Sequence, residues 1–453
     1  MNRQAVIAMD GQNPAEGPLV EHPHIRKTLL LMFCGYVIMW YLQIGYRVPL
    51  LGAIRFEFIY AAVLTAFALL LTPKIDIKCP LLPYVLLYFF VIAIQVPFSK
   101  DFNTSWDVLV DRVIKFAFMA FFIVSFVRSP THLRFFLAAF LLACLKMGQE
   151  GLLGHLSGGL VWENQGIIRL HGSTPLYAHP NSFAGMALGT LPFVYFLWPL
   201  CTSYIKGILL TIGILSLHII LYTGSRTAYV AVMAFFAFVF YKSKRKKKFI
   251  VCFVLALVVS LPMIPSDYYE RFRSIFTWQE KEGRSSEARI EILEDALQIF
   301  KENPLGVGVA AFPKVRMERF GRMQDTHNLY LEIATNLGIQ GVVVVGLMLY
   351  KMLGLLNKIR ISARKDISVI IGRSKYPNNN VMHDLLWIEA IASATISFII
   401  IRLTLGLFGM DLYEIYWWFA IGITFSLYSM LNCINSALVD NSAGVAFKDR
   451  ALV

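Results

Sequence analysis

Long apolar runs recur along almost the whole chain, and they limit its fold more than any other feature. Many of them approach or reach the length of about 20 residues that a helix needs to cross roughly 30 Å of hydrocarbon. Of the 453 residues, 57% are hydrophobic and 16% are charged, whereas soluble domains are nearer half apolar and a quarter charged. Backbone polar groups in hydrocarbon must be satisfied within their own segment, so the runs predict helices. We therefore expect an all-α polytopic membrane protein.

About twelve transmembrane helices are expected, nine within residues 29–264 and three within residues 327–432. In chain order the expected spans are 29–44, 56–71, 81–97, 110–127, 133–149, 181–200, 205–222, 228–241, 249–263, 327–356, 385–405 and 415–431. Residues 1–28 form an expected N-terminal tail, residues 265–326 a long loop and residues 433–453 a C-terminal tail. Because a polar tail precedes the first run, we expect that run to be a signal anchor that is not cleaved.

The basic residues predict the orientation of these spans. Loops that alternate along the chain are rich in Lys and Arg, above all "KSKRKKK" (Lys242–Lys248) and the segment 357–376, and the positive-inside rule puts them in the cytoplasm. Both termini are then cytoplasmic, and the loop 265–326 lies outside. The net charge of +13 is explained in this way, so no nucleic-acid partner is expected. All six cysteines fall in helices or on the cytoplasmic side, so we expect no disulfide in the exported part.

The outside loop contains one expected amphipathic helix, in "SSEARIEILEDALQIFKENPLGVG". Its apolar positions are predicted to form one helical face; they are Ile290, Ile292, Leu293, Ala296, Leu297 and Phe300. Ser285 or Ser286 is a plausible N-cap, and Asn303-Pro304 ends the helix. The helix is too short and too charged to span, so we expect it along the membrane surface or over the mouth of the bundle.

Polar residues at the outer ends of helices are the candidates for chemistry. His327 and Asn328 stand where a polar stretch enters an apolar run, either as an interfacial helix cap or with the imidazole as a general base. Arg226 sits at a tight outside turn, and either snorkels to headgroups or binds an anion within the bundle. His179 and Asn181 precede a helix rich in small residues. That helix favours close packing, but the two residues could also line a site.

The outside loop is also rich in arginine. A guanidinium group can donate two parallel hydrogen bonds to the oxygens of one phosphate, so a phosphate-bearing partner is one interpretation. The alternative is a surface whose arginines pair with neighbouring acids. These arginines are Arg271, Arg273, Arg284, Arg289, Arg316, Arg319 and Arg322. No Cys/His cluster, glycine-rich phosphate loop or nucleotide fingerprint is present, so neither a metal nor a cofactor is expected.

Four motifs in order resemble those of a known family. "HPNSFAG", "GSRTAYVAV", "ARIEILEDALQIFKENPLGVGVAAF" and "DTHNLYLEIATNLGIQGV" resemble the O-antigen ligase and O-antigen polymerase superfamily, bacterial inner-membrane glycosyltransferases of the GT-C type. The resemblance covers roughly Ile168 to Leu349. The first 150 residues agree in general character only, for example in "GAIRFEF".

The resemblance implies an activity and a site. Members of the family move a glycan from undecaprenyl diphosphate to a hydroxyl acceptor at the periplasmic face, without a nucleotide sugar or a metal. Two arginines are thought to hold the diphosphate, and a histidine is thought to activate the acceptor. Arg226 matches the arginine of the family's "SR" turn, Arg289 the arginine at the start of the periplasmic helix, and His327 the histidine of "HN". Arg284 is close enough to rival Arg289. A single displacement would invert the anomeric configuration.

The acceptor and the function class stay open. A ligase would use lipid A–core, a polymerase the next lipid-linked repeat unit, and a protein O-oligosaccharyltransferase a Ser or Thr; no large periplasmic domain follows the last span, which disfavours the third. A transporter or flippase of lipid-linked oligosaccharide is the alternative from another class. It would need an internal repeat, which we do not find, and charges along a central path. Asp111, Arg112 and Lys115 are either such charges or a cluster at the outer end.

Overall fold

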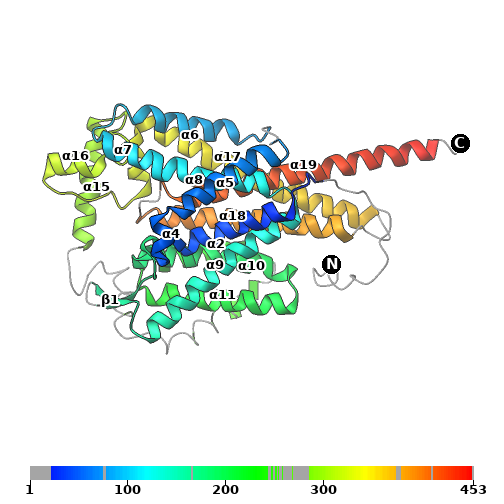
Figure 1. The fold of residues 1–453 in the computed structure, drawn as a ribbon, viewed down its shortest axis with the longest axis horizontal. Helices are drawn as coiled ribbons and strands as arrows, with labels where there is room; N and C mark the ends of the chain where they lie inside the picture. Colours follow the sequence, from blue (N-terminus) through cyan, green and yellow to red (C-terminus); the bar gives the residue numbers. More distant parts are fainter. Residues whose placement is uncertain are drawn as a thin grey trace.

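The computed structural model describes residues 22–74, 78–164, 167–242, 246–247, 250–251, 254, 258, 268, 285–373, 379–409 and 412–450. Its helices run mainly along the long axis of the molecule (Figure 1). Six helices in this part of the chain are long and apolar enough to cross a membrane. They are α9 (Pro130–Leu156), α10 (Pro180–Leu197, continued by the short 3-10 helix η3, Trp198–Leu200), α11 (Ser203–Tyr222), α17 (Leu329–Arg373), α18 (Asn379–Leu405) and α19 (Ile415–Arg450).

Shorter helices complete the described bundle. Three of them are largely apolar: α2 (Lys27–Leu42), α5 (Phe56–Leu71) and α6 (Leu82–Gln95). A continuous stretch joins α7 (Phe102–Val108), the π-helix η1 (Leu109–Ile114) and α8 (Lys115–Phe126). The others are α3 (Ile44–Arg47), α4 (Pro49–Ala53), α12 (Arg226–Lys242), α15 (Ser285–Glu302), α16 (Phe312–Phe320) and the 3-10 turn η2 (Pro175–Tyr177).

The positions of the expected spans agree with helices wherever the structure describes them. A polytopic helical membrane protein is therefore supported, whereas the count of twelve spans stays a prediction. The expected ninth span, 249–263, lies almost wholly outside the described residues. α19 continues to Arg450, through most of the residues expected as a C-terminal tail.

The structure adds one feature to the expected helical fold. The chain is not purely helical, because β1 (Val161–Asn164) and β2 (Ile167–Leu170) form an antiparallel hairpin in which Val161 pairs with Leu170. The hairpin follows α9, which runs to Leu156 and so ends later than the expected span did. It fills part of the segment between α9 and α10 that the hydropathy pattern left without structure.

Close packing of α10 against α18 lies at the centre of the bundle, as the small residues of α10 indicate. Gly185 and Gly189 face Arg402 of α18, and a Cβ atom at Gly189 would lie 3.0 Å from the Phe398 ring. Arg402 is buried, donates a hydrogen bond of 2.9 Å to the Gly185 carbonyl and lies over the ring of Tyr416. A buried guanidinium is costly in a membrane protein unless it is satisfied in this way.

α17 is broken near its N-terminal end. Gly338 has φ 70° and ψ −168°, so it interrupts the helix. The loop that follows α15 fills the break: Val307 donates to the Thr335 carbonyl (2.8 Å), and Ile339 donates to the Pro304 carbonyl (2.9 Å). The short helical segment from Leu329 to the break at Gly338 has the entrance of α17 at its first residue.

Candidate functional site at the entrance of α17

Asn328 caps α17 and leaves the neighbouring imidazole available. The Oδ1 atom of Asn328 accepts hydrogen bonds from the backbone N–H groups of Tyr330 (3.0 Å) and Leu331 (3.1 Å), which is the role of an N-cap side chain. Its Nδ2 atom donates to the Leu407 carbonyl. His327 has a left-handed backbone with φ 46° and an exposed side chain. Its ring forms no hydrogen bond with any residue that the structure describes.

The charges around His327 favour its neutral form. Desolvation by the surrounding protein lowers the pKa of the imidazole, and the positive charges of Arg289 and Arg316 lower it further. Asp325 acts in the opposite direction. A neutral imidazole has a free nitrogen lone pair at neutral pH, so it is able to accept a proton.

His179 approaches His327 from a distant part of the sequence. It precedes α10, and its Nδ1 atom accepts a hydrogen bond of 3.2 Å from the Asn181 backbone N–H. Desolvation lowers the pKa of His179, and the charges of Arg169 and His327 lower it further. The charge of His327 therefore acts on His179, a residue from a distant part of the sequence.

Arg169 joins three segments at this site, although its sequence pattern did not single it out. It lies on β2 and is only 4% exposed. Its Nε atom donates a hydrogen bond to the Thr223 carbonyl (2.7 Å), and its Nη2 atom donates one to Asn181 Oδ1 (2.9 Å). Asn181 is thus a partner of Arg169. Because Thr223 lies three residues before Arg226, the same contacts hold the start of α12 beside the entrance of α10.

The turn before Arg226 is compact. Gly224 has φ 57°, and a Cβ atom there would lie 2.8 Å from the Ile167 side chain. Ser225 is buried and caps α12, with its Oγ atom accepting from the Ala228 N–H (3.3 Å). Arg226 is the first residue of α12 and is half-buried, so its backbone position is tightly fixed.

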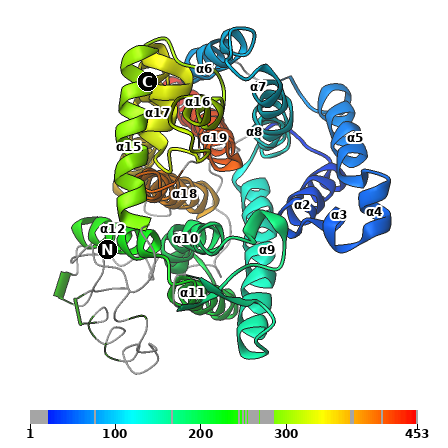
Figure 2. The ribbon, with the colours of Figure 1, turned by 90° about the vertical axis from the view of Figure 1, so that its left-hand side faces the viewer.

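α15 lies across this end of the bundle, and part of its expected apolar face is buried. Figure 2 shows α15 extending over the end of the bundle towards α12. Ile292, Ala296 and Ile299 are buried, and Ala296 and Ile299 pack in one cluster with Val307 and Phe312. Three other members of the expected apolar face are not buried in the structure. Those exposed residues are Ile290, Leu293 and Leu297.

Most of the described arginines of the outside loop pair with acids. Arg316 is 1% exposed and lies 2.8 Å from Asp295. Arg319 pairs with Glu302 at 2.5 Å, and Arg322 contacts Glu291 and Asp295. These pairs support the interpretation that these three arginines are structural. Arg289 is half-buried on α15, and its positive charge lowers the pKa of His327. Arg271, Arg273 and Arg284 lie outside the described residues.

Arg112 lies at the same mouth. It forms an ion pair of 2.9 Å with Glu414, and its charge opposes the desolvation that raises the pKa of Asp325. Its side chain is 53% exposed. Arg112 of the charge cluster 111–115 therefore lies at the same end of the bundle as Asp325; whether that end faces outside stays a prediction.

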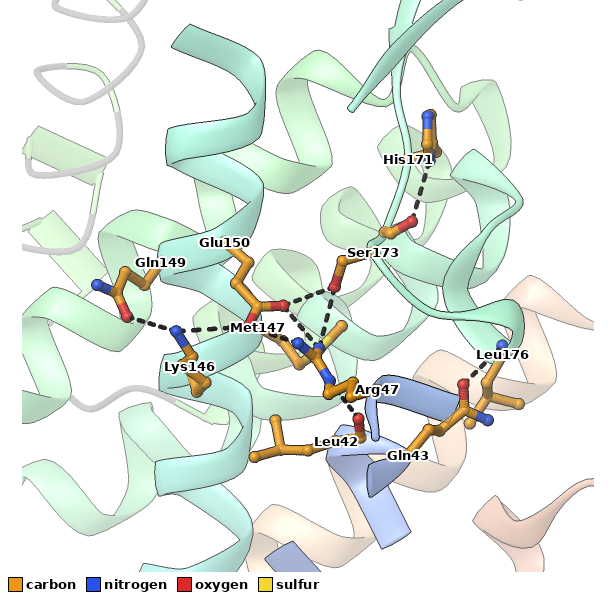
Figure 3. Close-up of polar contacts among 11 residues, drawn as sticks. Leu42, Gln43, Arg47, Lys146, Met147, Gln149, Glu150, His171, Ser173 and Leu176 are labelled. Atoms are coloured by element: carbon orange, nitrogen blue, oxygen red, sulfur yellow. Dashed lines mark hydrogen bonds and ion pairs between the residues drawn. The ribbon is translucent and has the colours of Figure 1, made fainter. Parts of the chain in front are cut away.

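A polar network anchors the segment that leads to His179 (Figure 3). Arg47 after α2 forms two hydrogen bonds with Glu150 of α9, at 2.8 and 2.7 Å, and a third with Ser173 at 3.0 Å. Gln43 accepts from the Leu176 N–H at 3.1 Å. These contacts fix the chain shortly before it enters α10.

One comparison with known proteins matches part of this chain. Residues 211–346 match the family described as O-antigen ligase, and that range contains Arg226, Arg289 and His327. No curated protein matches the chain. Among the described residues no group of three or more His, Cys, Asp or Glu side chains is placed to hold a metal ion.

Proposed function

We propose that this chain, whose residues 211–346 match the family described as O-antigen ligase, transfers a glycan from undecaprenyl diphosphate to a hydroxyl acceptor. The reaction would occur at the periplasmic face of the bacterial inner membrane. The observation that carries the proposal is the convergence at His327, where the charges of Arg289, Asp325 and His179 interact with one exposed imidazole. These residues come from three separate segments of the chain.

His327 acts as the general base in this proposal. Its neutral imidazole takes the proton from the acceptor hydroxyl, whose oxygen attacks the anomeric carbon of the donor glycan. The bond between that carbon and the diphosphate oxygen breaks, and undecaprenyl diphosphate leaves with the bonding electrons. One displacement inverts the anomeric configuration.

Arg226 and Arg289 hold the diphosphate. Fixed guanidinium groups stabilise the negative charge that develops on the leaving group, and they contribute most where water is scarce. Arg284 is the alternative to Arg289. Arg289 has a second effect, because it keeps His327 neutral while the site is empty. A bound diphosphate offsets that positive charge, so the imidazole becomes more basic when the donor is in place.

The acceptor distinguishes a ligase from a polymerase. The test is an in vitro transfer assay with the full chain, a defined undecaprenyl-diphosphate repeat unit and, in a second arm, lipid A–core. A ladder of products without added acceptor identifies a polymerase. Transfer that needs lipid A–core identifies a ligase, and transfer to a Ser or Thr peptide identifies a protein O-oligosaccharyltransferase.

The His327→Ala variant tests the catalytic role. We expect transfer to fall by about 10²–10⁴-fold, the range that a general base contributes. His24→Ala is the matched control, since His24 is an exposed histidine just before α2. Full activity in His327→Ala would exclude the proposed base. Donor movement between leaflets without any transfer would favour the transporter instead.

A further inference from the structure

A second site lies at the opposite end of the bundle from His327. A cavity of about 1020 Å³ is lined by α10, α11, α12, α17 and α18. Two of its lining residues, Arg360 and Arg364, stand about 32–38 Å along α17 from Ile339, the first residue after the break, at 1.5 Å per residue. The hydrocarbon of a membrane is roughly 30 Å thick, so this cavity belongs to the other membrane interface and not to the glycan-transfer site.

The walls of the cavity suit hydrocarbon chains. They come mainly from apolar side chains of α10, α11 and α12, among them Val194, Ile214 and Phe235. Ile214 is 57% exposed, so this wall is open in the described structure. Tyr195 and Trp198 also line it, and such aromatic residues are enriched at the level of lipid headgroups.

Cationic side chains line the same cavity. Lys242, Arg360 and Arg364 face it, with Glu389 as the one carboxylate among its lining residues. Arg364 donates to Glu389 at 2.5 Å. Arg360 donates to Asn357 at 2.6 Å, while its buried Nε atom has no hydrogen-bond partner in the described structure. Three cations against one carboxylate leave a positive excess beside an apolar wall.

We propose that this cavity binds an anionic diacyl phospholipid. The phosphate would interact with Lys242 and Arg360, and the acyl chains would cover the wall formed by α10, α11 and α12. Basic pockets between transmembrane helices bind such headgroups, and the positive excess favours an anionic lipid over a zwitterionic one. The neighbouring Lys246 and Lys247 are exposed and extend the same positive surface.

The test is native mass spectrometry of the delipidated full chain with added lipid. Phosphatidylglycerol is the anionic probe, phosphatidylethanolamine the zwitterionic probe, and undecaprenyl phosphate and inorganic phosphate are separate arms. We expect phosphatidylglycerol to bind at least about tenfold more tightly than phosphatidylethanolamine, and Lys242→Gln/Arg360→Gln to weaken it about thirtyfold. The control is Lys358→Gln/Lys365→Gln, which removes the same charge from exposed positions of α17 that do not line the cavity.

A second pair of variants tests the apolar wall and leaves every charge in place. Ile214→Trp fills the cavity from an exposed position, so phosphatidylglycerol binding should fall. Val343→Trp changes a comparably exposed residue of α17, 53% exposed, and should leave binding unchanged. Equal binding of both phospholipids, equal losses in variant and control, or binding of undecaprenyl phosphate or free phosphate alone would each overturn the proposal.

Discussion

At the scale of single residues, Asn328 caps α17, and the neighbouring His327 is the proposed general base. Asn328 satisfies the first N–H groups of α17, so the imidazole is not needed as a cap. The left-handed backbone of His327 costs roughly 1 kcal/mol for a residue with a side chain. This conformation turns the chain between Asp325 and α17. The capping by Asn328 therefore leaves the imidazole of His327 without a capping role, as the proposed general base requires.

The pH dependence of transfer follows from the charges at His327. Because the pKa of the folded protein's imidazole is lowered, the neutral base persists below the ordinary value of about 6.5. We expect kcat/KM to be full at neutral pH and to fall as the pH drops through a midpoint below 6.5. Arg289→Gln should move this midpoint upward, and Asp325→Asn should move it downward.

Rate measurements between pH 4.5 and 8 provide the check. Arg319→Gln is the matched control, because Arg319 pairs with Glu302 and does not contribute to the pKa of His327. A midpoint that stays in place in both Arg289→Gln and Asp325→Asn would assign the pH dependence to another group.

The sequence predicted some of these residues and missed another. His327, Asn328 and His179 stand beside helix starts, where a polar residue in an apolar context is conspicuous. Arg169 lies in a short strand and looks like any surface arginine in the sequence. Its importance comes from burial and from its contacts with Thr223 and Asn181, which depend on tertiary packing. Arg226 was singled out by its tight turn and Arg289 by the family motif, and their phosphate-binding role stays a proposal.

At the scale of elements, the break in α17 connects the outside loop to the site. Gly306 and Gly338 meet backbone to backbone: a Cβ atom at Gly338 would lie 2.3 Å from the Leu305 carbonyl carbon, and one at Gly306 would lie 2.6 Å from the Asn336 oxygen. Hydropathy alone predicted one continuous span here. A glycine within a helical pattern is an ambiguous signal, because its partner, the loop after α15, is distant in sequence.

Gly338→Ala should disrupt this connection. Alanine does not fit a backbone with φ 70° and ψ −168°, and such strain costs about 1–3 kcal/mol before the clash is added. We expect faster hydrogen exchange in a peptide covering residues 303–312, whose amides bond to the carbonyls of Thr335 and Asn336. Transfer should fall as the entrance of α17 shifts.

Gly346→Ala is the matched control on the same helix. A Cβ atom at Gly346 has nothing within 4 Å, and replacing a helical glycine by alanine is favourable by about 1 kcal/mol. Unchanged exchange in Gly338→Ala would mean that the loop does not depend on the break. Comparable exchange in both variants would lead to the same conclusion.

At the scale of the whole molecule, the two ends of the bundle present different kinds of polar side chain. The end with α15 and α16 presents histidines with arginines, and the other end presents lysines and arginines beside an apolar cavity. The apolar runs predicted the bundle because hydrocarbon requires helices. They did not predict the β1–β2 hairpin, whose four-residue strands are too short to show a period. The full number of spans and their orientation stay predictions.

Metal independence is a property of the whole proposed mechanism. Guanidinium groups supply the positive charge at the diphosphate, a task that Mg²⁺ performs in many phosphoryl-transfer enzymes. We expect an excess of EDTA to leave the transfer rate unchanged within about twofold, because each lost kcal/mol of transition-state stabilisation would slow the reaction about fivefold. Arg226→Gln should instead reduce the rate strongly, with or without Mg²⁺. Rescue of Arg226→Gln by Mg²⁺, or loss of wild-type activity in EDTA that Mg²⁺ restores, would show that a metal shares the task, and the arginine pair would then not be sufficient to hold the leaving group.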